Sequence, residues 1–493
     1  MKIYYNNFVK IKLPKYIQIL LVKLAENLAE AEDSTIMKQS SMTSGSIVRI
    51  LIFFTLPLLV GNIFQQFYSM ADTFIVGRTI GVDALAAVGC TGSITFLIIG
   101  FAQGFTSGLS IRVAQRYGAG DEEGVRRGIA CGALLSLAAT VVLTVMSCAL
   151  TRTILLAMNT PAEILEQAYD YLIVIFAGTG TTILFNYVSN ISRALGDSRT
   201  PLIFLVVACI INIALDYFLI LQVGMNVEGA AYATIAAQLF SGVACLLYML
   251  RRFPQMRLHR SDWILSGDSL SHALALALPM GFQMSVIALG QIAVQFALNG
   301  LGSVYVAAFT ASQKIDNMAI QPAISFGVGI STFAAQNYGA GKIHRIRKGI
   351  LQCCLLSGGF SILIGAVIVL FGKNLVALFV GAGEIQVIDL ANTYLIINGS
   401  LYAILAVMVT LRSALQGLGQ GGITTFGGMM ELAMRTVVAL AFTGQFGFLA
   451  VCVASPMAWV GALIPLAVYA VRYLHRLALE NPEPVPSSTG SVQ

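Results

Sequence analysis

The chain has 493 residues, of which 57% are hydrophobic and 11% are charged, and its formal net charge is +6. A soluble chain of this length carries about a quarter charged residues, so the composition excludes an ordinary soluble enzyme. The mean hydropathy of +0.81 instead indicates an all-α polytopic membrane protein.

Residues 1–41 precede the first long apolar block and combine a basic start with an amphipathic stretch. They lack the long apolar core and the small-residue cleavage site of a secretory signal. An interfacial helix is one interpretation of this segment. We favour the other, that it is a dispensable N-terminal extension upstream of a start at Met37 or Met42.

Twelve apolar blocks of about twenty residues follow, each long enough to cross the hydrocarbon core as a helix. They lie near residues 50–75, 86–110, 128–150, 169–191, 201–222, 228–250, 273–298, 303–330, 349–371, 390–414, 423–443 and 446–471. Because a helix satisfies its own backbone groups, the sequence predicts twelve transmembrane helices. The polar, Pro-rich residues 477–493 predict a disordered tail.

Basic residues are concentrated in alternate connections between the predicted helices, beginning with the connection between the second and third helices. This asymmetry is the positive-inside signal, so both termini are expected in the cytoplasm and the protein in the cell inner (plasma) membrane. Basic loops that face anionic lipid headgroups explain the net charge better than nucleic-acid binding does.

The eight cysteines all lie in or beside apolar blocks, and neither a CxxC pair nor a Cys/His cluster occurs in the sequence. We interpret them as buried apolar side chains rather than as disulfides or metal ligands. The four histidines fall in polar loops or at helix ends, which is typical of interfacial residues.

The chain contains an internal repeat. SIRVAQRYGAGDEEGVRRGI (110–129) and STFAAQNYGAGKIHRIRKGI (331–350) are identical at ten of twenty positions without a gap. Pro57 and Pro279, which we expect to open the first helix of each half, match at an offset of 222. A repeat of this length is a signature of the fold and should be sought before weaker signals.

The repeat is six helices long, so the chain returns to the side that it left and the two halves are parallel. We assign residues 42–250 to an N-lobe of helices one to six and residues 273–476 to a C-lobe of helices seven to twelve. Residues 251–272 are expected to form a cytoplasmic linker between them.

Parallel six-plus-six architecture is typical of secondary transporters that work by alternating access. The GxxxxGK[ST] loop that binds nucleotide phosphates is absent, as are HExxH and any clear nucleophile–base arrangement. We therefore expect no enzymatic activity, and we expect transport to be driven by an ion gradient or by the gradient of the substrate itself. A passive channel or membrane scaffold is the alternative, although no filter-like loop occurs.

Several motifs in this sequence resemble the multidrug and toxic compound extrusion (MATE) family, and especially its bacterial drug exporters. They are LPLLVGNIFQQFYSMADTFIVGRTIGVDALAAVG, AQRYGAGD and SRALGDSRTP in the first half, and AAQNYGAGK and LRSALQGLGQGG in the second. The resemblance runs from about Met42 to Arg476.

The resemblance implies antiport: export of cationic, amphipathic compounds in exchange for Na⁺ or H⁺, which is multidrug efflux and a route to antibiotic resistance. It implies no cofactor besides the coupling ion. The expected partners are small-molecule organic cations and the lipid bilayer, and the expected state is a monomer. A related two-lobe flippase of lipid-linked precursors is a further alternative.

A polar stripe lies inside the first predicted helix, in LLVGNIFQQFYSMADTFIV (58–76). Asn62, Gln65, Ser69 and Asp72 follow helical spacing and therefore share one face. A charge at the bilayer centre costs at least about 2.5 kcal/mol on insertion scales, so Asp72 is a functional candidate. The alternative interpretation is that Asp72 has no function in transport and is either hydrogen-bonded by neighbouring amides or located at the outer membrane interface. The resemblance favours function, because MATE members carry a functional acid at this place.

The fifth predicted helix contains INIALDYFLI, in which Asn212 and Asp216 are one turn apart and share a face. An amide carbonyl and a carboxylate are hard oxygen ligands for a small cation, and the same pair can hold a proton. In the resembled family this N-x-x-x-D pattern forms the N-lobe ion site together with the acid of helix one. The resemblance therefore implies a coupling site at Asp72, Asn212 and Asp216.

Three further side chains match family ligands more loosely. Thr234 corresponds to a hydroxyl ligand, and Asn190, or Asn186 one turn away, corresponds to an amide of helix four. We expect no metal site beyond Na⁺ at this coupling site, and we name no residue as a substrate ligand.

The second half lacks the equivalent acid, since Val294 occupies the position of Asp72 at the offset of 222. We therefore expect the site that couples ion binding to transport to lie in the first half. Glu431 and Arg435 are one turn apart in helix eleven, so we expect them to pair with each other, and a C-lobe site formed by them stays open. Lys314 and Asp316 are expected near the mouth of a cavity.

Overall fold

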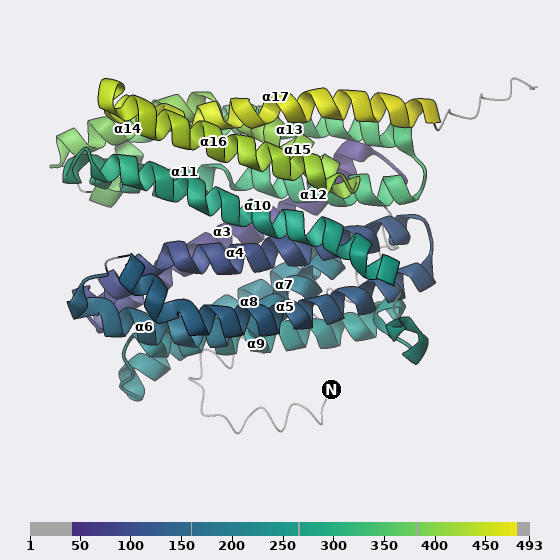
Figure 1. The fold of residues 1–493 in the computed structure, drawn as a ribbon, viewed down its shortest axis with the longest axis horizontal. Helices are drawn as coiled ribbons and strands as arrows, with labels where there is room; N and C mark the ends of the chain where they lie inside the picture. The colour runs from purple at the N-terminus through teal and green to yellow at the C-terminus, as the bar shows by residue number, and fades with distance from the viewer. Residues whose placement is uncertain (1–41, 159, 265–266, 381–382, 481–493) are drawn as a thin grey trace, which may run out of the picture. The chain divides into compact units, whose positions relative to one another are not determined.

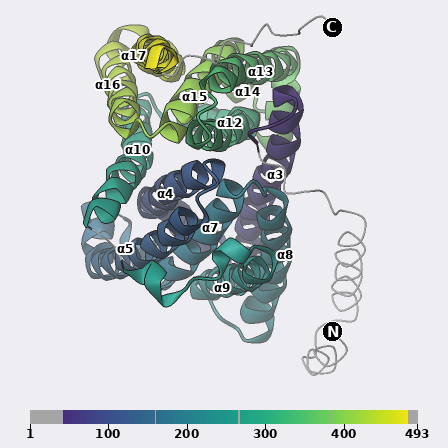
Figure 2. The same cartoon turned by 90° about the vertical axis from the view of Figure 1, so that its right-hand side faces the viewer.

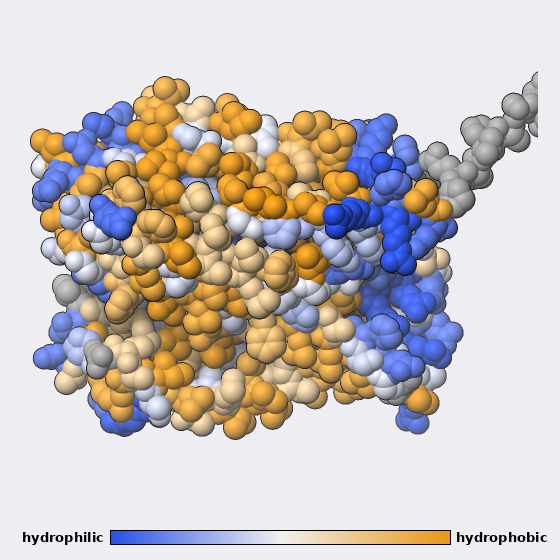
Figure 3. All heavy atoms as spheres, turned by 45° about the horizontal axis from the view of Figure 1, so that its top comes forward, coloured by the Kyte–Doolittle hydropathy of each residue, from blue (hydrophilic) through white to orange (hydrophobic). Residues whose placement is uncertain are grey.

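The computed structural model describes residues 42–158, 160–264, 267–380 and 383–480, which are helical almost throughout and contain no strand. The expected extension at residues 1–41 therefore lies outside the described residues. From Met42 onward the described residues belong to one unit by their contacts. Figure 3 shows an apolar surface between two more hydrophilic ends, as expected for a protein that crosses a membrane.

The first half contains α3 (Ile47–Thr79), α4 (Val82–Gly118), α5 (Glu122–Ala157), α6 (Ala162–Ala177), α7 (Thr179–Ala194), α8 (Arg199–Tyr217) and α9 (Val227–Arg252). The second contains α10 (Gly267–Asn299), α11 (Ser303–Ala319), α12 (Gln321–Gly339), α13 (Ile343–Val380), α14 (Ile385–Ser400), α15 (Tyr402–Gly417), α16 (Gly421–Phe446) and α17 (Phe448–Glu480). Among the described residues these make ten spans of sufficient length and apolarity, or twelve when each of two bent pairs is one span. The twelve predicted helices are confirmed.

Two of the spans are bent at equivalent places. α6 and α7 meet at Gly178 with an angle of 45°, and α14 and α15 meet at Leu401 with an angle of 50°. A third span breaks at Ile320, because Pro322 in the first turn of α12 has no N–H to continue the ladder of α11. The remaining long helices run without such a break.

Three predicted boundaries are wrong. Pro57 and Pro279 lie inside α3 and α10 rather than at their starts, because membrane helices tolerate proline where neighbours satisfy the freed backbone group. α10 begins at Gly267, so part of the expected linker and not only the C-lobe is helical. α17 continues to Glu480 because its last apolar residues still pack, so the tail does not begin at residue 477.

The two halves pack by the same rule, which confirms the repeat. α3 packs on α8 as α10 packs on α16, and between the halves α4 packs on α10 as α12 packs on α3. Figure 1 shows the second half above the first, and Figure 2 shows α3, α4, α10 and α12 where the two halves meet. We keep the terms N-lobe for α3–α9 and C-lobe for α10–α17.

The lobes are joined by matching hydrogen bonds at the end where α4, α7, α12 and α15 finish, which we call the basic end. Gln115 of α4 donates through Nε2 to the backbone oxygen of Gly417 at 2.9 Å. Gln336 of α12 donates in the same way to Ala194 at 2.8 Å. Each glutamine comes from one copy of the repeat and caps the broken span of the other lobe.

The repeated YGAG sequence explains why the helices approach so closely here. An added Cβ on Gly118 would lie 1.9 Å from the backbone oxygen of Gln336, and one on Gly339 would lie 1.8 Å from that of Gln115. Only glycine permits such an approach. The second glycine of each motif, Gly120 or Gly341, ends its helix with a φ of 72° or 68°. We call these glutamine and glycine contacts the seal.

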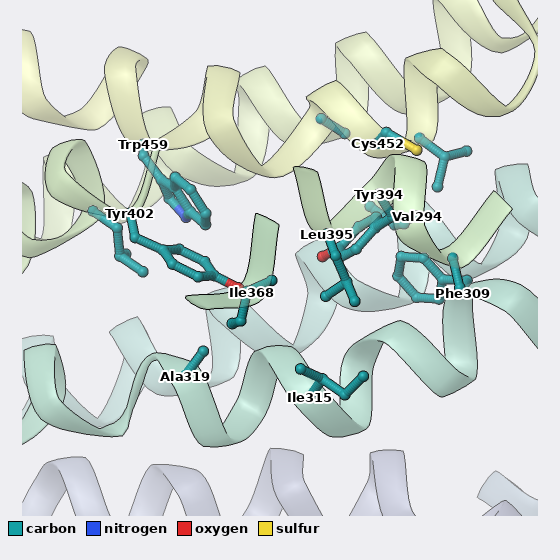
Figure 4. Close-up of a cluster of buried hydrophobic side chains, with 14 of the residues drawn as sticks. Val294, Phe309, Ile315, Ala319, Ile368, Tyr394, Leu395, Tyr402, Cys452 and Trp459 are labelled. Atoms are coloured by element: carbon teal, nitrogen blue, oxygen red, sulfur yellow. The ribbon is translucent and has the colours of Figure 1, made fainter. Parts of the chain in front are cut away.

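A cluster of apolar side chains fills the C-lobe between α11, α14, α15 and α17. Figure 4 shows Phe309, Ile315 and Ala319 of α11 pointing toward Tyr394 and Tyr402. One side of α11 is thereby packed in the C-lobe core, and its opposite side is not part of this cluster.

Candidate functional site

The acid of the first helix is held inside the N-lobe. Asp72 lies on α3, two turns before the helix ends at Thr79, and its side chain is partly buried. α3 packs directly on α8 along this part of the fold. One carboxylate oxygen of Asp72, Oδ1, is fully buried and has no hydrogen-bond partner among the described residues.

α8 supplies two further polar groups on one face. Asn212 is 1% exposed and Asp216 is 0% exposed, so both side chains are inside the lobe. α8 ends at Tyr217, immediately after Asp216, and continues as a π-helical turn over Phe218–Gln222. Such turns within helices are frequent at functional sites, because they re-aim side chains at a fixed point.

A hydroxyl of α9 connects these helices. Thr234 Oγ1 accepts a hydrogen bond of 3.1 Å from Asn212 Nδ2 and lies 3.1 Å from the hydroxyl of Tyr68. Tyr68 is one turn before Asp72 on α3, so the network orients the two helices that carry the acids.

The two carboxyl groups face each other. Asp72 and Asp216 are close enough to interact directly through their side chains, and Tyr171 of α6 interacts electrostatically with both. The site therefore draws on four helices, and its members are Tyr68, Asp72, Tyr171, Asn212, Asp216 and Thr234. We call this group the carboxylate site.

The oxygens of the site lack partners. Asp72 Oδ1, Asn212 Oδ1 and both carboxylate oxygens of Asp216 are buried without a hydrogen bond from any described residue. A buried ionised carboxylate without a partner is costly, and two adjacent ones repel each other. The arrangement can be satisfied by a small cation held among hard oxygen ligands or by protons on the acids. Within the described part of the chain, no three His, Cys, Asp or Glu side chains gather as a metal cluster.

The structure brings together most of the predicted site residues, but not Asn190. Asn190 donates to Thr106 at 3.2 Å and accepts from Arg193 at 2.9 Å, so it serves a different contact of α7. Its neighbour Asn186 bonds back to Thr182 within α7. Tyr68 was missed by the sequence reasoning, although its position one turn from Asp72 was a usable signal.

The C-lobe holds no copy of the carboxylate site at the equivalent position. Val294 is 2% exposed and packs among apolar residues. The predicted pair of Glu431 and Arg435 is confirmed at 3.0 Å, and Arg412 of α15 also contacts Glu431 at 3.1 Å.

Asp316 does not lie at a cavity mouth as expected. It is 7% exposed and accepts a hydrogen bond of 2.5 Å from the hydroxyl of Tyr402. The helical spacing of α11 explains the difference, because Asp316 falls on the buried face of α11, within reach of Tyr402 of α15, while Lys314 falls on the exposed face.

A family comparison decides what kind of protein carries this site. The MatE family model matches residues 57–218 and again residues 279–440, once in each lobe. The chain belongs to the MATE family. The first match contains Asp72, Asn212 and Asp216, and the second contains Val294, so the two MATE repeats differ in the acids that they carry.

Relatives and solved structures agree with this assignment. The chain is 31% identical over 350 residues to the probable multidrug resistance protein YoeA of Bacillus subtilis, covering 69% of this chain and 75% of that protein. It is 25% identical over 386 residues to an FAD transporter of Shewanella oneidensis, covering 76% and 83%. A MATE family transporter solved in an outward-facing conformation aligns with a TM-score of 0.82 at 22% identity, covering 90% of this chain and 99% of that one.

Proposed function

We propose that this MATE protein exports amphipathic organic compounds, organic cations among them, in exchange for Na⁺ or H⁺. The observation that carries the proposal is the set of buried oxygens without partners at Asp72, Asn212 and Asp216. A site with this deficit binds a cation or proton more strongly when it is closed and dry than when water can satisfy it. Binding then biases the N-lobe between two conformations, which is what coupling requires.

The names of the relatives support efflux, although their substrates differ. YoeA is described as a probable multidrug resistance protein, whereas the Shewanella oneidensis relative is described as an FAD transporter. The two-lobe repeat supports alternating access, in which one lobe rocks against the other. We propose that one chain is sufficient and that the protein works as a monomer in the cell inner membrane.

The distribution of basic residues supports an orientation in which the basic end and both termini are cytoplasmic. In that orientation the seal closes the cytoplasmic side, because it joins α4 and α12 to the opposite lobes. The carboxylate site lies toward the other end of α3, nearer the outside.

The test is ion-driven efflux of ethidium from reconstituted vesicles, with a sodium or proton gradient imposed alone. Asp72→Asn and Asp216→Asn keep the side-chain shape but remove the charge, so we expect each to abolish gradient-driven efflux. Asp389→Asn is the matched control, because Asp389 is exposed and pairs with Lys373 at 2.7 Å away from the site. Its efflux should equal that of the wild type.

Normal gradient-driven efflux by both site variants would overturn the coupling assignment. Ethidium movement that only follows its own gradient, in the wild type, would instead support the channel. The gradient that drives the wild type identifies the coupling ion.

A further inference from the structure

An exposed polar face runs along α11. Ala307, Thr310, Lys314 and Asn317 are exposed and follow the three-and-four spacing of a single helix face. They lie within the membrane-length span Ser303–Gly339, of which Lys314 is the twelfth residue. An apolar face would be expected there if this side of the span contacted lipid.

Lys314 carries a charge that the protein does not balance. No described residue forms an ion pair or hydrogen bond with its amine, whereas Lys373 of α13 pairs with Asp389 of α14. The neighbouring acid Asp316 points the other way and is occupied by Tyr402. An intramembrane charge without a protein partner indicates a function in a water-accessible region.

The exposed face of α11 is directed toward the N-lobe. Its opposite side packs into the C-lobe cluster, and Figure 4 shows ribbon in the colour of the N-terminal half beyond α11. Ser325 lies in the same span, eleven residues after Lys314 and beyond the break at Ile320. Ser325 accepts a hydrogen bond of 3.1 Å from Asn62 of α3.

The facing part of α3 offers polar groups but no exposed acid. Gln65 and Ser69 continue the stripe of Asn62 and are exposed, whereas Asp72 is partly buried and turned to Asp216. Phe64 and Phe67, exposed at 46% and 55%, lie on the other side of α3 from this stripe. The surface between the two helices therefore combines the Lys314 amine, which has no ion-pair or hydrogen-bond partner among the described residues, with neutral polar groups.

We propose that Lys314 binds an anionic group, a carboxylate or phosphate, on the compound that the protein transports. The substrate class is then amphipathic compounds that carry an oxyanion, zwitterions included, and is not restricted to organic cations. An ammonium group is a point charge with three donors, which suits a single oxyanion of varying shape. The inference rests on the proposed export function, since it concerns the same transported compound.

The test compares two dyes with the same ring system, rhodamine 110 with a free carboxylate and rhodamine 123 with its methyl ester. Binding to the purified full chain is measured by fluorescence polarisation for the wild type and for Lys314→Gln. We expect the substitution to weaken binding of the carboxylate dye by about tenfold or more, since a charge-assisted hydrogen bond is lost. Binding of the ester should change less than about twofold, which is within the scatter of a neutral contact.

Two variants separate charge from structure. Lys314→Arg keeps the charge and should retain the preference for the carboxylate dye. Lys373→Gln makes the same substitution at an exposed, ion-paired lysine and should leave both affinities unchanged. Equal affinity of the wild type and Lys314→Gln for the carboxylate dye would overturn the proposal.

Vesicle efflux of the same two dyes distinguishes this inference from the export function. Lys314-dependent binding without gradient-driven efflux would leave the anion site standing and overturn the proposed export. Efflux of both dyes that is unaffected by Lys314→Gln would leave export standing and overturn the anion site.

Discussion

Glu431 forms ion pairs with two arginines inside the C-lobe. It contacts Arg435 at 3.0 Å and Arg412 at 3.1 Å, and the exposed fractions of these side chains are between 5% and 13%. A charge buried in this way is tolerated only while its partners remain, because removing one partner leaves the other uncompensated. We therefore predict a structural role for this group.

Glu431→Gln should destabilise the protein by roughly 3–5 kcal/mol, the usual cost of breaking a buried ion pair. The measurement is the thermal unfolding midpoint in detergent, followed by size-exclusion chromatography. Glu166→Gln is the matched control, since Glu166 pairs with Arg152 at 2.8 Å on the surface and both side chains are more than half exposed. A midpoint for Glu431→Gln equal to that of the control would contradict this account.

At this scale the sequence predicted the acids better than their partners. Asp72, Asn212 and Asp216 stand out because a carboxylate or a paired amide in an apolar helix needs a reason. Tyr171 and the bond from Tyr402 to Asp316 could not be predicted, because each depends on how one helix is rotated against another. The prediction that Asn190 belongs to the site was wrong for the same reason.

The close approach of the helices at the seal depends on the absence of a Cβ atom from one glycine in each lobe, Gly118 and Gly339. Gly118→Ala or Gly339→Ala adds a Cβ less than 2 Å from a backbone oxygen of the other lobe, so the closed arrangement must separate. Overpacking of this kind costs typically about 1–3 kcal/mol, which is about 5–150-fold in population. We expect each variant to shift the protein toward opening at the basic end.

The distance between spin labels on the exposed residues Arg127 and Lys348, measured by electron–electron double resonance, reports this opening. It should lengthen in Gly118→Ala and in Gly339→Ala. Gly359→Ala is the control, because an added Cβ there has nothing within 4 Å. An unchanged distance in both seal variants would show that another contact holds the lobes together.

The positions of the helices were predictable, but the two bends within the paired spans were not. Apolar length identifies a span without ambiguity in a chain this hydrophobic. The bends at Gly178 and Leu401 have no shared residue type, since one is glycine and the other leucine. They follow from packing within each lobe, which composition does not encode.

Because the sequence is duplicated, a short repeated motif was enough to predict how the two halves are arranged. The match between residues 110–129 and 331–350 fixed an even number of helices per half, and hence parallel lobes. The same motif supplies the glutamines and glycines of the seal between the lobes. The repeat in the sequence identified this motif but did not indicate that it forms the contact.

The proposed orientation can be checked on the intact protein. A cysteine at Asn226, between α8 and α9, should react with a membrane-impermeant reagent added outside, and one at Arg257 in the linker should not. The physical basis is the excess of basic residues at the basic end. Labelling of the linker from outside would reverse the orientation and, with it, the side that the seal closes.

The glutamine and glycine contacts of the seal contain no titratable group. Amides and backbone carbonyls keep the same charge across the whole physiological range, so these hydrogen bonds are equally strong on the acidic and the alkaline side of a proton gradient. Ionic strength also has little to screen there. Under the proposed coupling, a change in the membrane gradient therefore acts through occupancy of the carboxylate site, and these seal contacts respond through the conformation that this occupancy selects.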